Sequence, residues 1–115
     1  MIVFISGAIT SVPDYKERFS KAEKHLYEIG AEAVFNPATL PYSDKISHDE
    51  YMAICFKMLD CCDTIFLLNG WAESEGACSE EAYGSMLDYN FLKEEYTDEK
   101  LRREIEAIRS REKGD

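Results

Sequence analysis

The sequence predicts a small α/β protein with a Rossmann-like (flavodoxin-like) parallel sheet of three to five strands, flanked by helices and followed by a charged C-terminal helix. Two observations predict this class. Short apolar segments alternate along the chain with amphipathic segments that have helical spacing. The 115 residues, 45% of them hydrophobic, suffice for a single small core. We therefore expect an α/β domain over residues 1–95 and an amphipathic helical tail over residues 96–115.

The first part of the chain indicates strand, helix and strand in that order. Residues 2–5 form an apolar run that ends at Ser6 and Gly7. Apolar side chains then recur at steps of four and three, as on one face of a helix: Tyr15, Phe19, Ala22, Leu26 and Ile29. Gly30 ends that helix, and residues 32–35 are the second strand candidate. A long, turn-rich segment follows as far as residue 47.

The second part repeats the alternation. A second helix carries its apolar residues at helical spacing: Tyr51, Ile54, Cys55, Met58, Leu59 and Cys62. Residues 64–68 form a buried-looking strand, a third helix begins near Gly76, and residues 89–92 can add a short fourth strand. The tail helix starts near Thr97 and has a narrow apolar stripe: Leu101, Ile105 and Ile108. That stripe packs either on its own domain or on another subunit.

Three strand-then-helix units imply right-handed crossovers and a parallel sheet, so all strand carboxyl ends meet at one edge. The loops expected to converge there are residues 6–13, 36–47 and 69–75. Small molecules bind at this edge in open α/β sheets. Residues 69–80 are the strongest candidate, because a glycine-containing turn leads there from a strand into a helix. Asp63 precedes its strand and is therefore predicted to be structural, at the opposite edge.

The charge of the chain narrows the choice of partner. The net charge of −10 argues against binding to nucleic-acid polymers or to an anionic membrane surface. No apolar run approaches the roughly 20 residues that span a bilayer, and the start lacks the basic residues of a signal peptide. We expect a cytoplasmic protein that binds a small molecule.

The pattern of cysteine and histidine residues predicts neither a metal site nor a cofactor. The four cysteines contain no C-x-x-C pair, and His25 and His48 are far apart in the sequence. Cys55 and Cys62 lie on the apolar stripe of the second helix, where a reduced, buried thiol behaves as a small apolar residue.

Four motifs stand out in order along the chain: residues 4–10 (FISGAIT), 36–38 (NPA), 62–64 (CDT) and 70–80 (GWAESEGACSE). Together they resemble the nucleoside 2-deoxyribosyltransferase superfamily, in a small branch found in phages and bacteria, and are also similar to 2′-deoxynucleoside 5′-phosphate N-hydrolases. The resemblance covers roughly residues 1–92 and makes the first domain deoxyribosyltransferase-like. It implies cleavage or exchange of the N-glycosidic bond of a deoxynucleoside or its 5′-monophosphate. It also implies a homodimer or a higher homo-oligomer.

The same resemblance implies that Glu80 is the catalytic nucleophile, being four residues after Gly76. A carboxylate against the anomeric carbon stabilises an oxocarbenium-like state or bonds to it, after which water gives hydrolysis and a second base gives transfer. His48 and Cys55 are candidates for supporting positions around the site. The predicted substrate-binding residues come from the three loops and the helix start: Gly7, Ala8, Ile9, Asn36, Pro37, Gly70, Trp71, Ser74, Gly76 and Ala77.

Departures from the superfamily pattern leave a second hypothesis open. Related nucleotide hydrolases carry a tyrosine, a serine and an arginine where this chain has Phe4, Ala8 and Thr10, and an assisting aspartate where it has Cys55. A neutral nucleoside is therefore easier to bind than a 5′-phosphate. The alternative function is a catalytically inactive nucleotide-binding or protein-interaction module. Trp71 can equally stack on a base or pack against a neighbouring helix or subunit.

Overall fold

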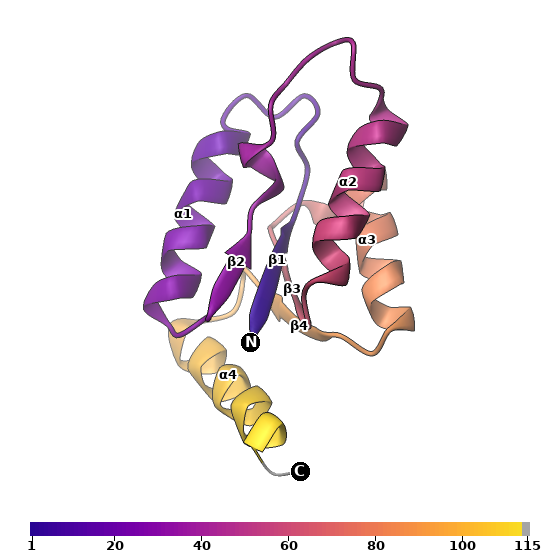
Figure 1. The fold of residues 1–115 in the computed structure, drawn as a ribbon. Helices are drawn as coiled ribbons and strands as arrows, with labels where there is room; N and C mark the ends of the chain where they lie inside the picture. The colour runs from indigo at the N-terminus through magenta and orange to yellow at the C-terminus, as the bar shows by residue number, and fades with distance from the viewer. Residues whose placement is uncertain (114–115) are drawn as a thin grey trace.

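The computed structural model describes residues 1–113, which form a four-stranded parallel sheet with helices on both faces (Figure 1). The spatial order of the strands is β2-β1-β3-β4. Their bounds are β1 Ile2–Ser6, β2 Ala33–Phe35, β3 Thr64–Leu67 and β4 Asn90–Lys93. The predicted α/β class is confirmed, and the short fourth strand extends the sheet beyond β3.

Within residues 1–113, three α-helices and two short 3-10 helices connect the strands, and a fourth α-helix follows β4. Their bounds are α1 Tyr15–Glu28, η1 Pro37–Thr39, α2 His48–Asp60, η2 Trp71–Glu73, α3 Glu75–Met86 and α4 Asp98–Lys113. The start of α2 is set by a capping box, in which Ser47 accepts from the Glu50 N–H and Glu50 accepts from the Ser47 N–H. None of the helices within residues 1–113 is long and apolar enough to cross a membrane.

The register of the sheet brings the strand carboxyl ends to one edge. Val3 lies beside both Val34 of β2 and Thr64 of β3, and all three strand pairs are parallel. The loops that follow β1 and β2 consequently emerge at the same end of the molecule, as Figure 1 shows. This is the carboxyl edge, and the opposite end of the sheet is the amino edge.

Side-chain alternation along the strands divides the core between the two faces. Val3 and Ile5 of β1 point to the face covered by α1 and α4. Phe4 of the same strand points to the face covered by α2 and α3, where it is completely buried. Because both faces are covered, the central strands are apolar except for Ser6 at the end of β1 and Thr64 at the start of β3, and they do not alternate with polar residues.

Helix α4 completes the first of these two cores. Its apolar stripe is almost fully buried, with Leu101, Ile105 and Ile108 exposed by only 1%, 2% and 3%. The three side chains join the cluster that contains Leu92 of β4. The stripe therefore packs on its own domain, which answers the question that the sequence left open. Residues 114 and 115 of the predicted tail lie outside the described residues.

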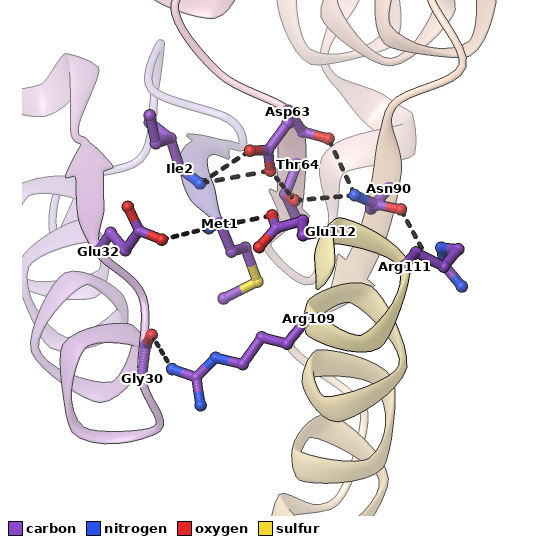
Figure 2. A network of polar contacts seen from close by, with 10 residues as sticks. All are labelled: Met1, Ile2, Gly30, Glu32, Asp63, Thr64, Asn90, Arg109, Arg111 and Glu112. Atoms are coloured by element: carbon purple, nitrogen blue, oxygen red, sulfur yellow. Dashed lines mark hydrogen bonds and ion pairs between the residues drawn. The ribbon is translucent and has the colours of Figure 1, made fainter. Parts of the chain in front are cut away.

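A network of polar contacts ties the amino edge together (Figure 2). Both carboxylate oxygens of Asp63 accept from the Ile2 N–H, at 3.2 and 3.3 Å, and Oδ1 also accepts from the Thr64 hydroxyl at 2.6 Å. Asn90 donates to the Asp63 carbonyl, and Arg111 of α4 donates to the Asn90 side chain. The prediction that Asp63 is structural and lies at this edge is confirmed.

Other contacts from α4 reach the same end of the molecule. The amino group of Met1 forms ion pairs with Glu32 at 3.3 Å and Glu112 at 3.2 Å, and Arg109 donates to the Gly30 carbonyl. Figure 2 shows these side chains grouped around the start of β1. The amino edge is thus closed by ion pairs and hydrogen bonds, in which the last turns of α4 take part.

Candidate functional site

The carboxyl edge holds a cavity of about 590 Å³, a volume within the range of small-molecule sites. Its wall comes from the loop after β1, the loop after β2, the segment before α3 and the first turns of α2 and α3. The three loops predicted to converge do converge. The predicted site residues that line the cavity are Gly7, Ala8, Ile9, Pro37, His48, Cys55, Ser74, Gly76, Ala77 and Glu80.

Glu80 is held in the cavity wall by the buried face of α3. It shares that face with Ala77 and Gly84, three residues before it and four after it, and the residue is only 5% exposed. Gly84 is needed for this packing, because a Cβ there would lie 2.3 Å from the Ile65 side chain of β3. The close approach of α3 to the sheet brings a carboxylate into a largely apolar layer.

One oxygen of Glu80 has a protein partner and the other does not. The Ser6 hydroxyl donates to Oε1 at 2.7 Å. Residues 1–113 provide no hydrogen bond to Oε2, and no fully buried side-chain oxygen or nitrogen in that range lacks a partner. Oε2 is therefore accessible from the cavity and free to contact a ligand.

Burial perturbs the acidity of Glu80. Removal from water raises the pKa of Glu80 to about 7, and the hydrogen bond from Ser6 opposes part of that rise. Near neutral pH the side chain consequently populates both its protonated and its ionised form. Buried carboxyl groups with such pKa values are frequent at functional sites, where a proton or a nucleophile is required.

Ser6 contacts Glu80 in the candidate site and was not selected by the sequence analysis. It is the last residue of β1 and is fully buried. A signal was present, because side chains two apart on a strand share a face, so Ser6 lies on the same face as Phe4. A buried hydroxyl on the face covered by α2 and α3 needs a polar partner, and Glu80 is that partner.

Cys55 lines the cavity as a neutral thiol. Burial, with a smaller contribution from the charge of Glu80, raises the pKa of Cys55 to about 12. The thiol thus adds no charge beside Glu80 and no reactive thiolate at neutral pH. Within residues 1–113, no group of three or more metal-ligating side chains is placed to hold a metal ion.

Three of the predicted binding residues do not line the cavity. Asn36 is buried, and its amide accepts from the Ala38 N–H at 2.9 Å and donates to Glu23 at 3.0 Å, so it fixes the start of η1. Gly70 adopts a φ of +87°, which is the turn requirement rather than a ligand contact. Trp71 is half-buried and packs against the core under α2 and α3, so its ring is a packing element.

Ser74 and Gly76 combine a structural role with a place in the wall. The Ser74 hydroxyl caps α3 by accepting from the Ala77 N–H at 3.2 Å. A Cβ at Gly76 would lie 3.3 Å from the sulfur of Met52, so the glycine allows α2 and α3 to approach closely beside the cavity. Both residues were predicted to bind substrate, and both lie where they can do so.

Much of the outer wall consists of residues that the sequence analysis did not select. They are Thr10, Tyr15, Ala38, Leu40, Pro41, Tyr42, Tyr51, Met52, Glu73 and Glu75. Tyr51 anchors the long loop, because its hydroxyl donates to the Pro41 carbonyl at 2.6 Å and accepts from the Ser43 N–H at 2.9 Å. Irregular loops of this length have no periodicity, so their contacts cannot be deduced from sequence.

Comparison with known protein families gives a match to the first part of the chain. Residues 1–92 match the family described as Domain of unknown function (DUF4406). The chain belongs to the DUF4406 family. No curated protein and no solved structure shows a significant match. The DUF4406 region ends within β4, so it contains the whole wall of the cavity and excludes α4.

Proposed function

We propose that this protein cleaves or exchanges the N-glycosidic bond of a 2′-deoxynucleoside, with Glu80 as the nucleophile. The observation that carries the proposal is a carboxylate only 5% exposed, with one oxygen bound by Ser6 and the other accessible from the cavity. Burying a carboxylate without an ion pair costs stability, and such costs are tolerated where function requires the group. The motifs resembling the nucleoside 2-deoxyribosyltransferase superfamily select the same residue.

The proposed reaction uses Glu80 twice. Its ionised Oε2 attacks the anomeric carbon as the bond to the base breaks, which gives a glycosyl-enzyme ester. Water or a second base then attacks the same carbon and releases Glu80. Two displacements retain the configuration at that carbon. The hydrogen bond from Ser6 to Oε1 fixes the direction in which Oε2 points.

The charges around the cavity favour a nucleoside over its 5′-monophosphate. Among the described residues that form the wall there is no lysine and no arginine, whereas Glu73 ends η2 and Glu75 begins α3. The N–H groups of that helix start can attract an anion, but the two carboxylates repel it. An uncharged sugar hydroxyl avoids this repulsion.

A binding module without catalysis is the second candidate, and Cys55 favours it. The residue lies in the wall close enough to Glu80 for the carboxylate charge to raise the thiol pKa. A thiol with a pKa of about 12 cannot assist the nucleophile as an ionised carboxylate would. If no residue assists Glu80 as nucleophile, the cavity binds nucleosides and does not cleave them.

The test is to incubate the protein with each 2′-deoxynucleoside and each 5′-monophosphate, with and without a second free base, and to measure released or exchanged base by chromatography. We expect release or exchange with nucleosides, and its loss in Glu80→Gln. The matched control is Glu81→Gln, because Glu81 is the adjacent acid on α3 but lies outside the cavity wall and accepts from Ser85.

Three results would each decide a part of the proposal. Cleavage that persists in Glu80→Gln would exclude Glu80 as the nucleophile. Binding of nucleosides by calorimetry without any turnover would identify the module. Inversion of configuration at the anomeric carbon, measured by NMR in the presence of methanol as acceptor, would exclude the ester intermediate.

A further inference from the structure

The wall of the cavity carries an excess of negative charge. Glu73, Glu75 and Glu80 all belong to it, and His48 is the only basic side chain among the described residues that form it. Glu73 and Glu75 are exposed at the mouth, whereas Glu80 is buried. A ligand moving inward therefore passes two acidic side chains and then meets a third.

The same wall offers few protons to a departing base, because Glu80 must be ionised when it attacks and cannot donate a proton in the same step. A neutral nucleobase leaves with an extra pair of electrons and needs a proton from a nearby acid. The Cys55 thiol, with its pKa raised to about 12, does not release one near neutral pH, and the Tyr51 hydroxyl proton is already donated to the Pro41 carbonyl. His48 is exposed at the start of α2 rather than buried beside Glu80.

We propose that the preferred substrates of this cavity are nucleosides whose base carries a fixed positive charge, such as a pyridinium or an N7-alkylated purine. This inference rests on the proposed function, because it assigns the substrate class of the same site. A cationic base is attracted by Glu73 and Glu75, is stabilised beside ionised Glu80, and needs no proton to leave.

The proposed reaction needs no reactant other than the nucleoside and water. A bond forms between Glu80 Oε2 and the anomeric carbon while the bond from that carbon to the charged ring nitrogen breaks. The bonding electron pair passes to the nitrogen, so the base departs neutral. Water then attacks the anomeric carbon, the ester oxygen leaves as the Glu80 carboxylate, and one proton passes to solvent.

The contribution of the two outer carboxylates should be modest and sensitive to salt. An exposed carboxylate a few ångström from a unit positive charge changes binding roughly two- to fivefold at low ionic strength. Two of them acting together should contribute about tenfold, and this contribution should decline as added salt shortens the range of the interaction.

The test compares nicotinamide riboside and its 2′-deoxy form with 2′-deoxyadenosine, each at 50 mM and at 500 mM NaCl. Rates are expressed relative to spontaneous hydrolysis of the same compound, which removes the intrinsic reactivity of pyridinium nucleosides. Dihydronicotinamide riboside, which has nearly the same shape and no charge, is assayed as a competitive inhibitor beside the oxidised compound. The variant is Glu73→Gln/Glu75→Gln, and its control is Glu99→Gln/Glu106→Gln on α4, away from the cavity.

We expect a rate enhancement at least about tenfold larger for the pyridinium nucleosides. It should fall several-fold at high salt and in Glu73→Gln/Glu75→Gln, and it should be unchanged in the control Glu99→Gln/Glu106→Gln. Equal enhancement for both classes, or a cationic preference that neither salt nor the double variant reduces, would overturn the inference and leave the proposed function standing. Absence of cleavage for every compound would instead refute the proposed function and the inference together.

Discussion

The two edges of the sheet each hold a partly or fully buried carboxylate, and the two carboxylates differ in how many hydrogen bonds they accept. At the amino edge, Asp63 accepts from the Ile2 N–H through both oxygens and from the Thr64 hydroxyl. At the carboxyl edge, Glu80 accepts from Ser6 alone among residues 1–113, and burial raises its pKa to about 7. A carboxylate whose hydrogen bonds are complete serves the fold, whereas one that is buried with an oxygen to spare is available for chemistry.

The largest expected effect is a difference in kcat between variants of the two carboxylates. Glu80→Gln should lower kcat for nucleoside cleavage roughly 10³-fold or more, because it removes the nucleophile itself. Asp63→Asn should leave kcat nearly unchanged, since Asp63 is at the opposite end of the sheet. Steady-state kinetics on both variants measures the contrast. An equal loss of kcat in folded Asp63→Asn would show that the two edges are coupled.

The second prediction concerns the helix that links the amino edge to the core. Ile105→Ala should reduce the free energy of unfolding by about 2–5 kcal/mol, because the side chain is 2% exposed in a packed cluster. Urea titration followed by circular dichroism measures the loss. The control is Ala107→Ser, an exposed change on the same helix, for which we expect little effect.

The third prediction follows from the raised pKa of Glu80. The folded protein keeps a proton on this group to about pH 7, whereas the unfolded chain loses it near 4.5. This contribution to stability is therefore complete below about pH 4.5 and is lost as the pH rises through 7, by about 3 kcal/mol. Glu80→Gln lacks this titration, so its unfolding free energy minus that of the wild type should increase by that amount between pH 4.5 and pH 8. Glu81→Gln should show no such change.

The smallest effect is expected for the satisfied carboxylate. Asp63→Ala should reduce the free energy of unfolding by about 1–3 kcal/mol, since the Ile2 N–H and the Thr64 hydroxyl each lose an acceptor. Asp63→Asn, which keeps one acceptor oxygen, should cost less. A loss in Asp63→Ala as small as that in Asp63→Asn would indicate that water replaces the carboxylate, and the contrast between the edges would then weaken.

Most of the fold could be predicted because its elements obey simple periodicities. The apolar steps from Tyr15 to Ile29 define the buried face of α1, and the stripe of Leu101, Ile105 and Ile108 defines that of α4. The ends were less certain, since β2 begins at Ala33 rather than Glu32 and β3 ends at Leu67 rather than Leu68. Which surface α4 covers required coordinates, because a stripe of three residues fits any apolar face.

The candidate site was predicted less completely than the fold. Glu80, Ser74 and Gly76 lie where a helix start follows a strand, so topology alone puts them near the cavity. Trp71 was harder, because an aromatic ring in a loop satisfies the same pattern whether it faces a ligand or the core. Tyr51 was assigned to the core stripe of α2, yet its hydroxyl holds a distant loop, a contact that periodicity does not encode.

Helix α4 lies beyond the DUF4406 region and yet covers the apolar side chains that α1 leaves open. A polypeptide ending at residue 92 would present Leu92 and its neighbours to water and would be prone to aggregate. We therefore expect the family segment to be less stable without α4 than in the full chain. The cavity wall and the helix that covers this apolar face come from separate stretches of the chain, so the sequence of the covering helix can vary without changing any residue of the cavity wall.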